Sequence, residues 1–193
     1  MRTLAVTQNI TVDGSIEMLG DWFDPQGQGE VDSSDLLDEL HRQDAAADAF
    51  LVGRRTFEDL RGYWPQLTDD PTGIADYLHR VQKYVVSATV TDPQWQNTTI
   101  LSEDPIGRIR ALKAQPGRDI VTTGSITLCH ALIEAELVDE YRLFVYPVVQ
   151  GRGRRLFPDG YELPRLTLLD AKAFRSGITY SRYAVQDRST DAA

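Results

Sequence analysis

The chain has 193 residues, of which 41% are hydrophobic and 25% are charged, as in an ordinary globular protein. Its formal net charge of −9 argues against nucleic-acid binding, which needs a basic surface, and no apolar run is long enough to cross a bilayer. The single cysteine, Cys129, excludes an internal disulfide, and no signal peptide precedes the first expected strand, so we expect a cytoplasmic protein.

Apolar runs alternate with segments of helical period along the first half of the chain. A buried strand is expected at residues 3–9, followed by a turn at Asp13-Gly14 and a Gly-rich loop at 24–32. The next expected elements, in chain order, are a helix capped by Ser33 or Ser34 and running to about residue 43, a strand at 49–52, a helix that ends at 62–65, a short helix at 74–80 and strands at 83–87 and 98–101.

The second half of the chain is richer in strands. The expected elements are a helix at 105–114, a strand at 119–123, a helix at 126–135 and strands at 139–149, 166–170 and 178–185. Strands that alternate with helices imply a mostly parallel sheet covered on both faces, and the strand-rich end implies antiparallel strands at one edge. We therefore predict one α/β domain over residues 1–186, with a frayed polar tail at 187–193.

The junction after the strand at 119–123 is the strongest candidate for a binding site. Gly124 allows the backbone to approach a ligand closely, and the following helix directs its positive N-terminus there. Ser125 is placed to cap this helix or to donate to a phosphate. An ordinary turn between a strand and a helix explains the same residues, so both interpretations stay open.

Gly53-Arg54-Arg55-Thr56 repeats this arrangement at a second strand end. Guanidinium groups and a hydroxyl at a helix N-terminus suit a phosphate ester, although a solvated arginine pair with a threonine cap fits equally well. Open α/β sheets bind ligands at the carboxyl ends of their strands, so two such junctions in one sheet favour a ligand site.

Other chemistries lack their motifs. The chain has neither a Gly-x-x-x-x-Gly-Lys phosphate loop nor a Gly-x-Gly-x-x-Gly fingerprint after the first strand. Its three histidines are scattered without ligand spacing, so no metal site is expected. Cys129 is interpreted as a small buried hydrophobic residue and not as a nucleophile.

Carboxylates and aromatic residues are plentiful around the first loop. Reduction of a C=N bond needs a proton source, and Asp13 is the leading candidate because it lies at the turn after the first strand. Trp22 and Phe23 precede the Gly-rich loop and could wall a pocket closed by a flap, or simply pack in the core.

A set of motifs along the chain, in this order, resembles the dihydrofolate-reductase-like superfamily. More narrowly, it resembles small bacterial proteins related to the C-terminal reductase domain of the bifunctional riboflavin-biosynthesis deaminase/reductase. The motifs are Asn9-Ile10-Thr11-Val12-Asp13-Gly14, Asp21-Trp22-Phe23, the segment 51–57, Tyr63-Trp64-Pro65, the segments 83–89, 95–98 and 120–128, and the segment 138–157. An unrelated sequence would rarely contain all of these motifs in this order.

The resemblance implies a three-layer α/β/α fold and NADPH bound across the sheet. The cofactor-binding residues that it implies are Gly53, Arg54, Arg55 and Thr56 at the phosphates, Ser87, Ala88 and Thr89 by the adenosine, Thr123, Gly124, Ser125 and Ile126 at the pyrophosphate, and Val6, Thr7 and Gly14 near the nicotinamide. The turn at the pyrophosphate departs from the family pattern. Two adjacent glycines are common there, whereas this chain has Gly124-Ser125.

Two functions are consistent with this resemblance. The first is an NADPH-dependent reductase that transfers a hydride to a small heterocyclic substrate, pterin-like or pyrimidine-like, in a pocket lined by Trp22, Phe23 and Phe57. The second is an NADPH-binding module of the same fold without catalytic activity. A homodimer is also expected, with its contact surface on the strand at 141–149 and the strands that follow it.

Overall fold

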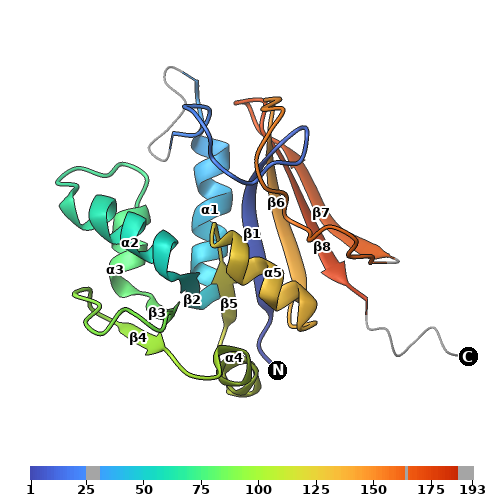
Figure 1. The fold of residues 1–193 in the computed structure, drawn as a ribbon. Helices are drawn as coiled ribbons and strands as arrows, with labels where there is room; N and C mark the ends of the chain where they lie inside the picture. Colours follow the sequence, from blue (N-terminus) through green and yellow to red (C-terminus); the bar gives the residue numbers. More distant parts are fainter. Residues whose placement is uncertain (25–30, 164, 187–193) are drawn as a thin grey trace, which may run out of the picture.

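The computed structural model describes residues 1–24, 31–163 and 165–186 and has a single sheet flanked by helices (Figure 1). In chain order its elements are β1 (Leu4–Thr11), α1 (Ser34–Ala46), β2 (Ala47–Gly53), α2 (Arg54–Tyr63), the short 3₁₀ helix η1 (Trp64–Gln66), α3 (Ile74–Arg80), β3 (Gln82–Val86), β4 (Thr98–Leu101), α4 (Pro105–Ala114), β5 (Asp119–Thr122), α5 (Ile126–Glu134), β6 (Glu140–Tyr146), β7 (Leu166–Ala173) and β8 (Thr179–Val185). No helix in these described ranges is long and apolar enough to cross a membrane.

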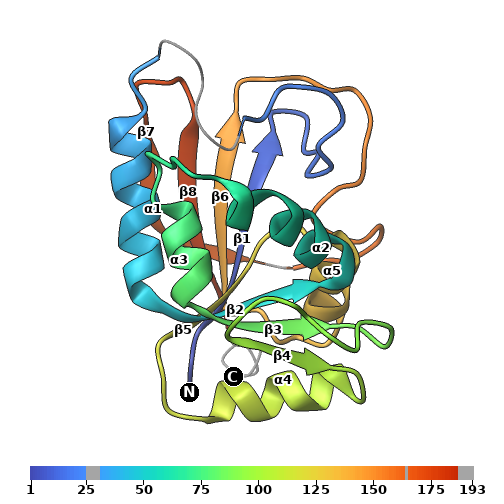
Figure 2. The same ribbon diagram turned by 90° about the vertical axis from the view of Figure 1, so that its left-hand side faces the viewer.

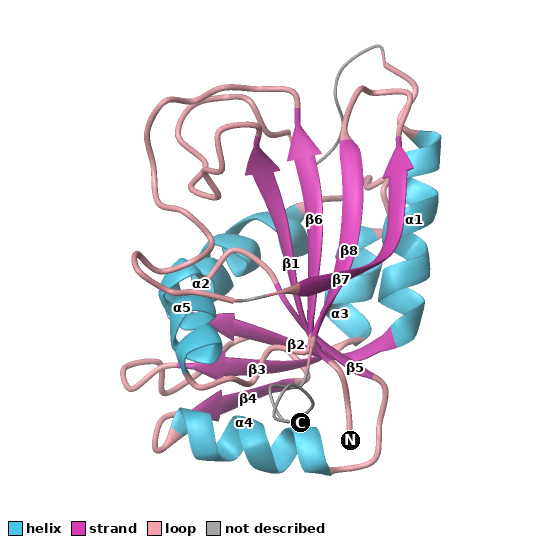
Figure 3. Cartoon of the chain, turned by 90° about the vertical axis from the view of Figure 1, so that its right-hand side faces the viewer, coloured by secondary structure: helices cyan, strands magenta, loops and turns pink. Residues whose placement is uncertain are grey.

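The sheet is mixed, with strand order β4-β3-β2-β5-β1-β6-β8-β7 (Figure 3). All pairs from β4 to β6 are parallel, whereas β8 pairs antiparallel with both β6 and β7. This arrangement confirms the predicted fold class, a mostly parallel sheet with antiparallel C-terminal strands at one edge.

Helices cover both faces of the sheet. Figure 2 shows α1, α2 and α3 in front of it, and Figure 3 shows α4 and α5 on the opposite side. The side chains of β2 alternate between two cores, as the pleat of a strand requires. Leu51 packs in the core that contains α5, while Phe50 and Val52 pack in the core that contains α2 and α3.

Two strands end at other residues than expected, for reasons of strand pairing and proline position. The strand expected at 139–149 ends at Tyr146, because Pro147 has no N–H for the ladder. The strand expected at 166–170 continues to Ala173, because its pairing with β8 continues to Thr179. Ser33 precedes α1 without a side-chain capping bond. The expected loop residues 25–30 and the tail 187–193 lie outside the described residues.

Cys129 lies at the centre of the α5 core with no exposed surface. Burial raises the pKa of its thiol to about 12, and the Gln8 side-chain amide donates to Sγ at 3.3 Å. A thiol held in its neutral form is a poor nucleophile. The structure therefore fits the interpretation of Cys129 as a small hydrophobic core residue.

We predict that iodoacetamide alkylates Cys129 in the native protein about a hundredfold more slowly than in guanidinium-unfolded protein at the same pH, because both burial and the raised pKa suppress the thiolate. Mass spectrometry of timed aliquots measures both rates on the single thiol of the chain. Equal rates in the two states would show that the α5 core opens freely.

Candidate functional site at the carboxyl ends of β2 and β5

The two glycine junctions predicted from the sequence lie against each other. β2 and β5 are adjacent parallel strands, so Gly53 and Ser125 follow them at the same edge of the sheet. The Gly53 N–H donates to Ser125 Oγ at 2.9 Å, and the Ser125 N–H donates to Thr56 Oγ1 at 2.9 Å. We call this reciprocal pair of hydrogen bonds the junction tie.

The topology makes this edge of the sheet the place where a ligand crevice is expected. After β2 the chain enters α2, whose Phe57 packs in the core on one face, and after β5 it enters α5, whose Leu132 packs in the core on the other. Adjacent strands whose following helices lie on opposite faces form a switch point, where open α/β sheets bind ligands. The N-termini of α2 and α5 therefore lie on either side of this expected crevice.

The turn before α5 requires close packing. Gly124 and Ser125 both have left-handed backbone angles, with φ of +57° and +43°. A Cβ on Gly124 would lie 3.1 Å from Thr56 Cγ2, so only glycine allows this approach without displacing Thr56. One glycine suffices because the left-handed conformation of Ser125 is stabilised by the junction tie.

Gln8 is a residue of this site that the sequence analysis missed. From β1, its side chain donates to the Gly124 carbonyl at 2.8 Å and accepts from the Gly124 N–H at 3.1 Å. This amide pair fixes the turn from the side opposite Thr56. The available signal was an amide side chain in the middle of a strand expected to be buried, because buried side-chain amides require partners.

Ser125 does not cap α5, which corrects one expectation. Its hydroxyl makes no capping bond within α5 and instead accepts from Gly53, the residue before α2. The helix N-terminal N–H groups, including those of Arg54 and Ile126, belong to first turns that have no intrahelical acceptors. This leaves the ends of both helices as donors for an anion in the crevice.

The remaining predicted cofactor positions behave differently. Ser87, just after β3, accepts from the N–H groups of Thr89 and Val90 at 3.1 and 3.0 Å, which forms a local turn one strand away from the junction tie. Val6 is fully buried in the α5 core, so its side chain is shielded from ligands. The adjacent Thr7 presents a buried hydroxyl without a hydrogen-bond partner among the described residues.

Asp13 binds its own loop. Its carboxylate accepts from the Thr11 hydroxyl at 2.6 Å and from the backbone N–H groups of Gln150 and Gly151 at 3.1 and 2.7 Å. These hydrogen bonds, that of Thr11 foremost, lower the pKa of Asp13 to about 2. A carboxylate that is ionised at neutral pH carries no proton to donate, so the geometry gives Asp13 the task of joining two loops.

We predict that Asp13→Asn lowers the melting temperature at neutral pH and that this deficit shrinks as the pH falls. The pKa of Asp13 is depressed by folding, so its stabilisation is complete above the unfolded value of about 4 and is lost as the pH falls toward 2. Thermal unfolding followed by circular dichroism between these limits measures the difference. The exposed Asp69→Asn is the control, and a pH-independent deficit of Asp13→Asn would contradict the assignment.

The three aromatic residues expected to share a pocket are separated, which corrects that prediction. Trp22 and Phe23 pack edge-to-face on Tyr146, with ring centroids at 5.2 and 5.9 Å. Phe57 is fully buried in the core on α2 and contacts Trp95 at 5.8 Å. Only the Trp22–Phe23 pair lies near the loops that follow β1 and β6, because the apolar face of α2 directs Phe57 into the core.

The sequence places this architecture in a known family. The chain matches the RibD C-terminal domain over residues 2–180. It belongs to the RibD C-terminal domain family. The uncharacterized protein YyaP of Bacillus subtilis is 30% identical over 190 residues, which cover 94% of each chain. The uncharacterized protein YwjB of the same organism is 26% identical over 167 residues, covering 86% of this chain and 84% of YwjB.

Solved structures share the fold of this RibD C-terminal domain at low sequence identity. A putative riboflavin biosynthesis protein from Shewanella has a TM-score of 0.72 and 17% identity, covering 96% of this chain and 99% of its own. RibD of Acinetobacter baumannii has a TM-score of 0.64 and 15% identity, and the match covers 96% of this chain and 58% of that longer one. Dihydrofolate reductase from Enterococcus faecalis, complexed with NADP(H), has a TM-score of 0.63 and 15% identity, covering 96% and 97%.

Proposed function

We propose that this protein is an NADPH-dependent reductase that transfers a hydride to a small heterocyclic substrate, pterin-like or pyrimidine-like. The junction tie carries the proposal, because it holds two helix N-termini side by side at the carboxyl ends of β2 and β5. Backbone donors and two positive helix ends in one crevice suit a pyrophosphate.

The residues present fit the cofactor. Gly124 brings the backbone close enough for N–H contact with a phosphate, and Ser125 and Ile126 begin the helix that would face it. Arg54 and Arg55 supply charge at the start of α2, where Arg54 forms an exposed ion pair with Glu58 at 2.9 Å that an incoming phosphate can replace. When bound, NADPH supplies the hydride.

Relatives support the same cofactor class. The Enterococcus faecalis enzyme of this fold is complexed with NADP(H), and another structure of the fold is a pyrimidine reductase-like protein from Corynebacterium diphtheriae, with a TM-score of 0.65 and 18% identity over 96% of this chain. Family membership over residues 2–180 includes both junctions.

Thr7 is the group of this chain that we assign to the substrate. Its hydroxyl is buried on β1 without a hydrogen-bond partner in the described part of the chain, and an unsatisfied buried hydroxyl is costly unless a ligand bonds to it. Thr7 follows Val6, which pairs in register with Thr122 at the end of β5, so it lies beside the crevice. The rival function, an NADPH-binding module without catalysis, uses the same cofactor residues, and in it Thr7 would contact only the nicotinamide, as the family resemblance implies.

We predict that NADPH quenches tryptophan emission with a dissociation constant in the micromolar range, about −8 kcal/mol, and that NADH binds more weakly. Arg54→Ala should weaken NADPH binding about tenfold, because it removes one charge-assisted contact to phosphate. The matched control is Arg80→Ala. Arg80 is exposed at the C-terminus of α3, just before β3 begins, and so lies at the amino-terminal end of the parallel strands.

A protein that binds neither nucleotide would refute the reductase proposal. Binding of NADPH without its oxidation in the presence of pterins, pyrimidines or flavins would favour the binding module. Equal losses in Arg54→Ala and Arg80→Ala would show that the α2 junction does not hold the cofactor.

We also propose a homodimer, with its contact narrowed to the C-terminal part of the surface expected from the sequence. β6 lies inside the sheet between β1 and β8, and its Tyr141 and Phe144 are buried, so it is not a contact surface. The edge strand β7 instead exposes Leu168 and Leu169, by 55% and 47%, at a bulge. Exposed edge strands are common pairing surfaces.

We predict a dimer in sedimentation velocity at micromolar concentration and its dissociation by Leu168→Glu, because a charge buried at an apolar contact is costly. Val149→Glu is the control, since Val149 is 73% exposed and outside the strands. A wild-type monomer, or dissociation by both variants, would remove β7 as the interface.

A further inference from the structure

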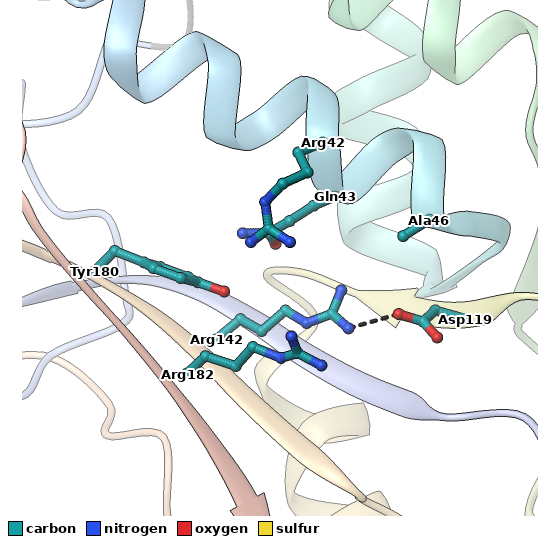
Figure 4. Close-up of a pocket in the computed structure, with 7 residues that line it drawn as sticks. All are labelled: Arg42, Gln43, Ala46, Asp119, Arg142, Tyr180 and Arg182. Carbon is teal, nitrogen blue, oxygen red and sulfur yellow. Dashed lines mark hydrogen bonds and ion pairs between the residues drawn. The ribbon is translucent and has the colours of Figure 1, made fainter. Parts of the chain in front are cut away.

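A polar cavity of about 60 Å³ lies beneath α1, at the amino-terminal end of β5 (Figure 4). Its wall includes Arg42 and Gln43 of α1, Asp119 at the start of β5, Arg142 of β6, and Tyr180 and Arg182 of β8. It is separate from the candidate active site, because β5 lies between them, with Asp119 at its start and the junction tie beyond its end at Thr122, about 10 Å away along the strand. The proposed reductase function does not use any of these residues.

Three of the four charged side chains on this wall are arginines. Asp119 is the one carboxylate among the lining residues, while Glu39 and Glu140 bind the guanidinium groups from outside the lining set. Arg142 is the most enclosed, with a side chain that is 4% exposed, whereas the half-exposed Arg42 gives the cavity a route to solvent. Asp119, Glu39 and Glu140 balance the charge of the three arginines, so what the wall offers a ligand is mainly N–H and O–H donors.

The arginines keep hydrogen-bond donors in reserve. Arg42 uses Nε and Nη2 to bind Glu39, and Arg182 uses the same two atoms to bind Glu140. Arg142 binds Glu140 and Asp119 through Nε and Nη2 as well. Within the described residues, each of the three Nη1 groups is left without a carboxylate acceptor.

Tyr180 supplies an independent observation. Tyr180 is only 1% exposed, and its hydroxyl has no hydrogen-bond partner among the described residues. Figure 4 shows this hydroxyl directed from β8 into the space between the Arg42 and Arg142 side chains. Burial raises the pKa of Tyr180 to about 12, so the phenol keeps its proton and can donate. A buried donor without an acceptor indicates a missing ligand.

We propose that this cavity binds a tetrahedral oxyanion of the size of inorganic phosphate or sulfate. Three guanidinium groups and one phenol match four anionic oxygens, and guanidinium forks are well suited to phosphate. The volume accommodates one such ion. Water fits this set of donors less well. Each water molecule also has two O–H donors that need acceptors, and Asp119 is the main acceptor on the wall.

The test is a titration with inorganic phosphate at constant ionic strength, without nucleotide, followed by melting temperature and by phosphorus NMR linewidth. Wild-type protein should be stabilised saturably by millimolar phosphate. Tyr180→Phe should weaken phosphate binding about fivefold, by loss of one neutral hydrogen bond, and Arg182→Gln should weaken it about tenfold or more. Tyr180→Phe removes only an unpartnered hydroxyl, so it is expected to fold.

Two controls locate the ion. Tyr183→Phe alters the same strand three residues further along, on its opposite face, and should bind phosphate as wild type does. Arg54→Ala alters the candidate cofactor site, and phosphate held in the cavity is retained in this variant. No saturable stabilisation of the wild type would overturn the proposal. So would unchanged binding in Tyr180→Phe and Arg182→Gln, or loss of binding in Arg54→Ala, which would place the phosphate at the junction tie.

Discussion

The junction tie is the interaction on which the geometry of the candidate site depends. Two backbone N–H groups and two hydroxyls, from segments about seventy residues apart, satisfy one another where β2 and β5 end. The tie sets the distance between the N-termini of α2 and α5, and it explains the left-handed backbone of Ser125. Because Gly124 packs against Thr56, the tie and the close turn require each other.

The two ends of the parallel sheet have different chemistry. At the carboxyl ends of β2 and β5, backbone N–H groups and the N-termini of α2 and α5 come together, with Arg54 and Arg55 at the start of α2. At the amino-terminal end of β5, the buried Arg142 and Glu140 form ion pairs with each other and with the partly exposed Asp119. Such pairs are costly to break singly, because removal of one partner leaves an uncompensated buried charge. Ligand chemistry at one end can therefore change while the other end is held constant.

The fold could be predicted from the sequence because its elements are local in origin. Alternating strands and helices and the glycine after β5 are visible in short windows, and so the fold class and both junctions were correctly located. Boundaries such as those of β6 and β7 were wrong because pairing with distant strands and the position of Pro147 decide them. The pocket assignment of Phe57 failed because a buried aromatic residue looks the same in a core as in a binding site.

Residues that meet only through tertiary structure could not be found in this way. Arg42, Arg142 and Arg182 come from α1, β6 and β8, and no spacing in the sequence links them. In the structure they join the C-terminal hairpin to the parallel sheet, since Arg182 and Arg142 share Glu140, and Lys172 of β7 binds Glu39 of α1 at 2.6 Å. The ion pairs of Glu39 and Arg42 therefore join α1 to β7, while those of Arg142 and Arg182 join β6 to β8 and β5. Because α1 also packs beside Phe144 and Tyr146, the same contacts position the loop residues Trp22 and Phe23, which lie in that cluster at the opposite end of the sheet.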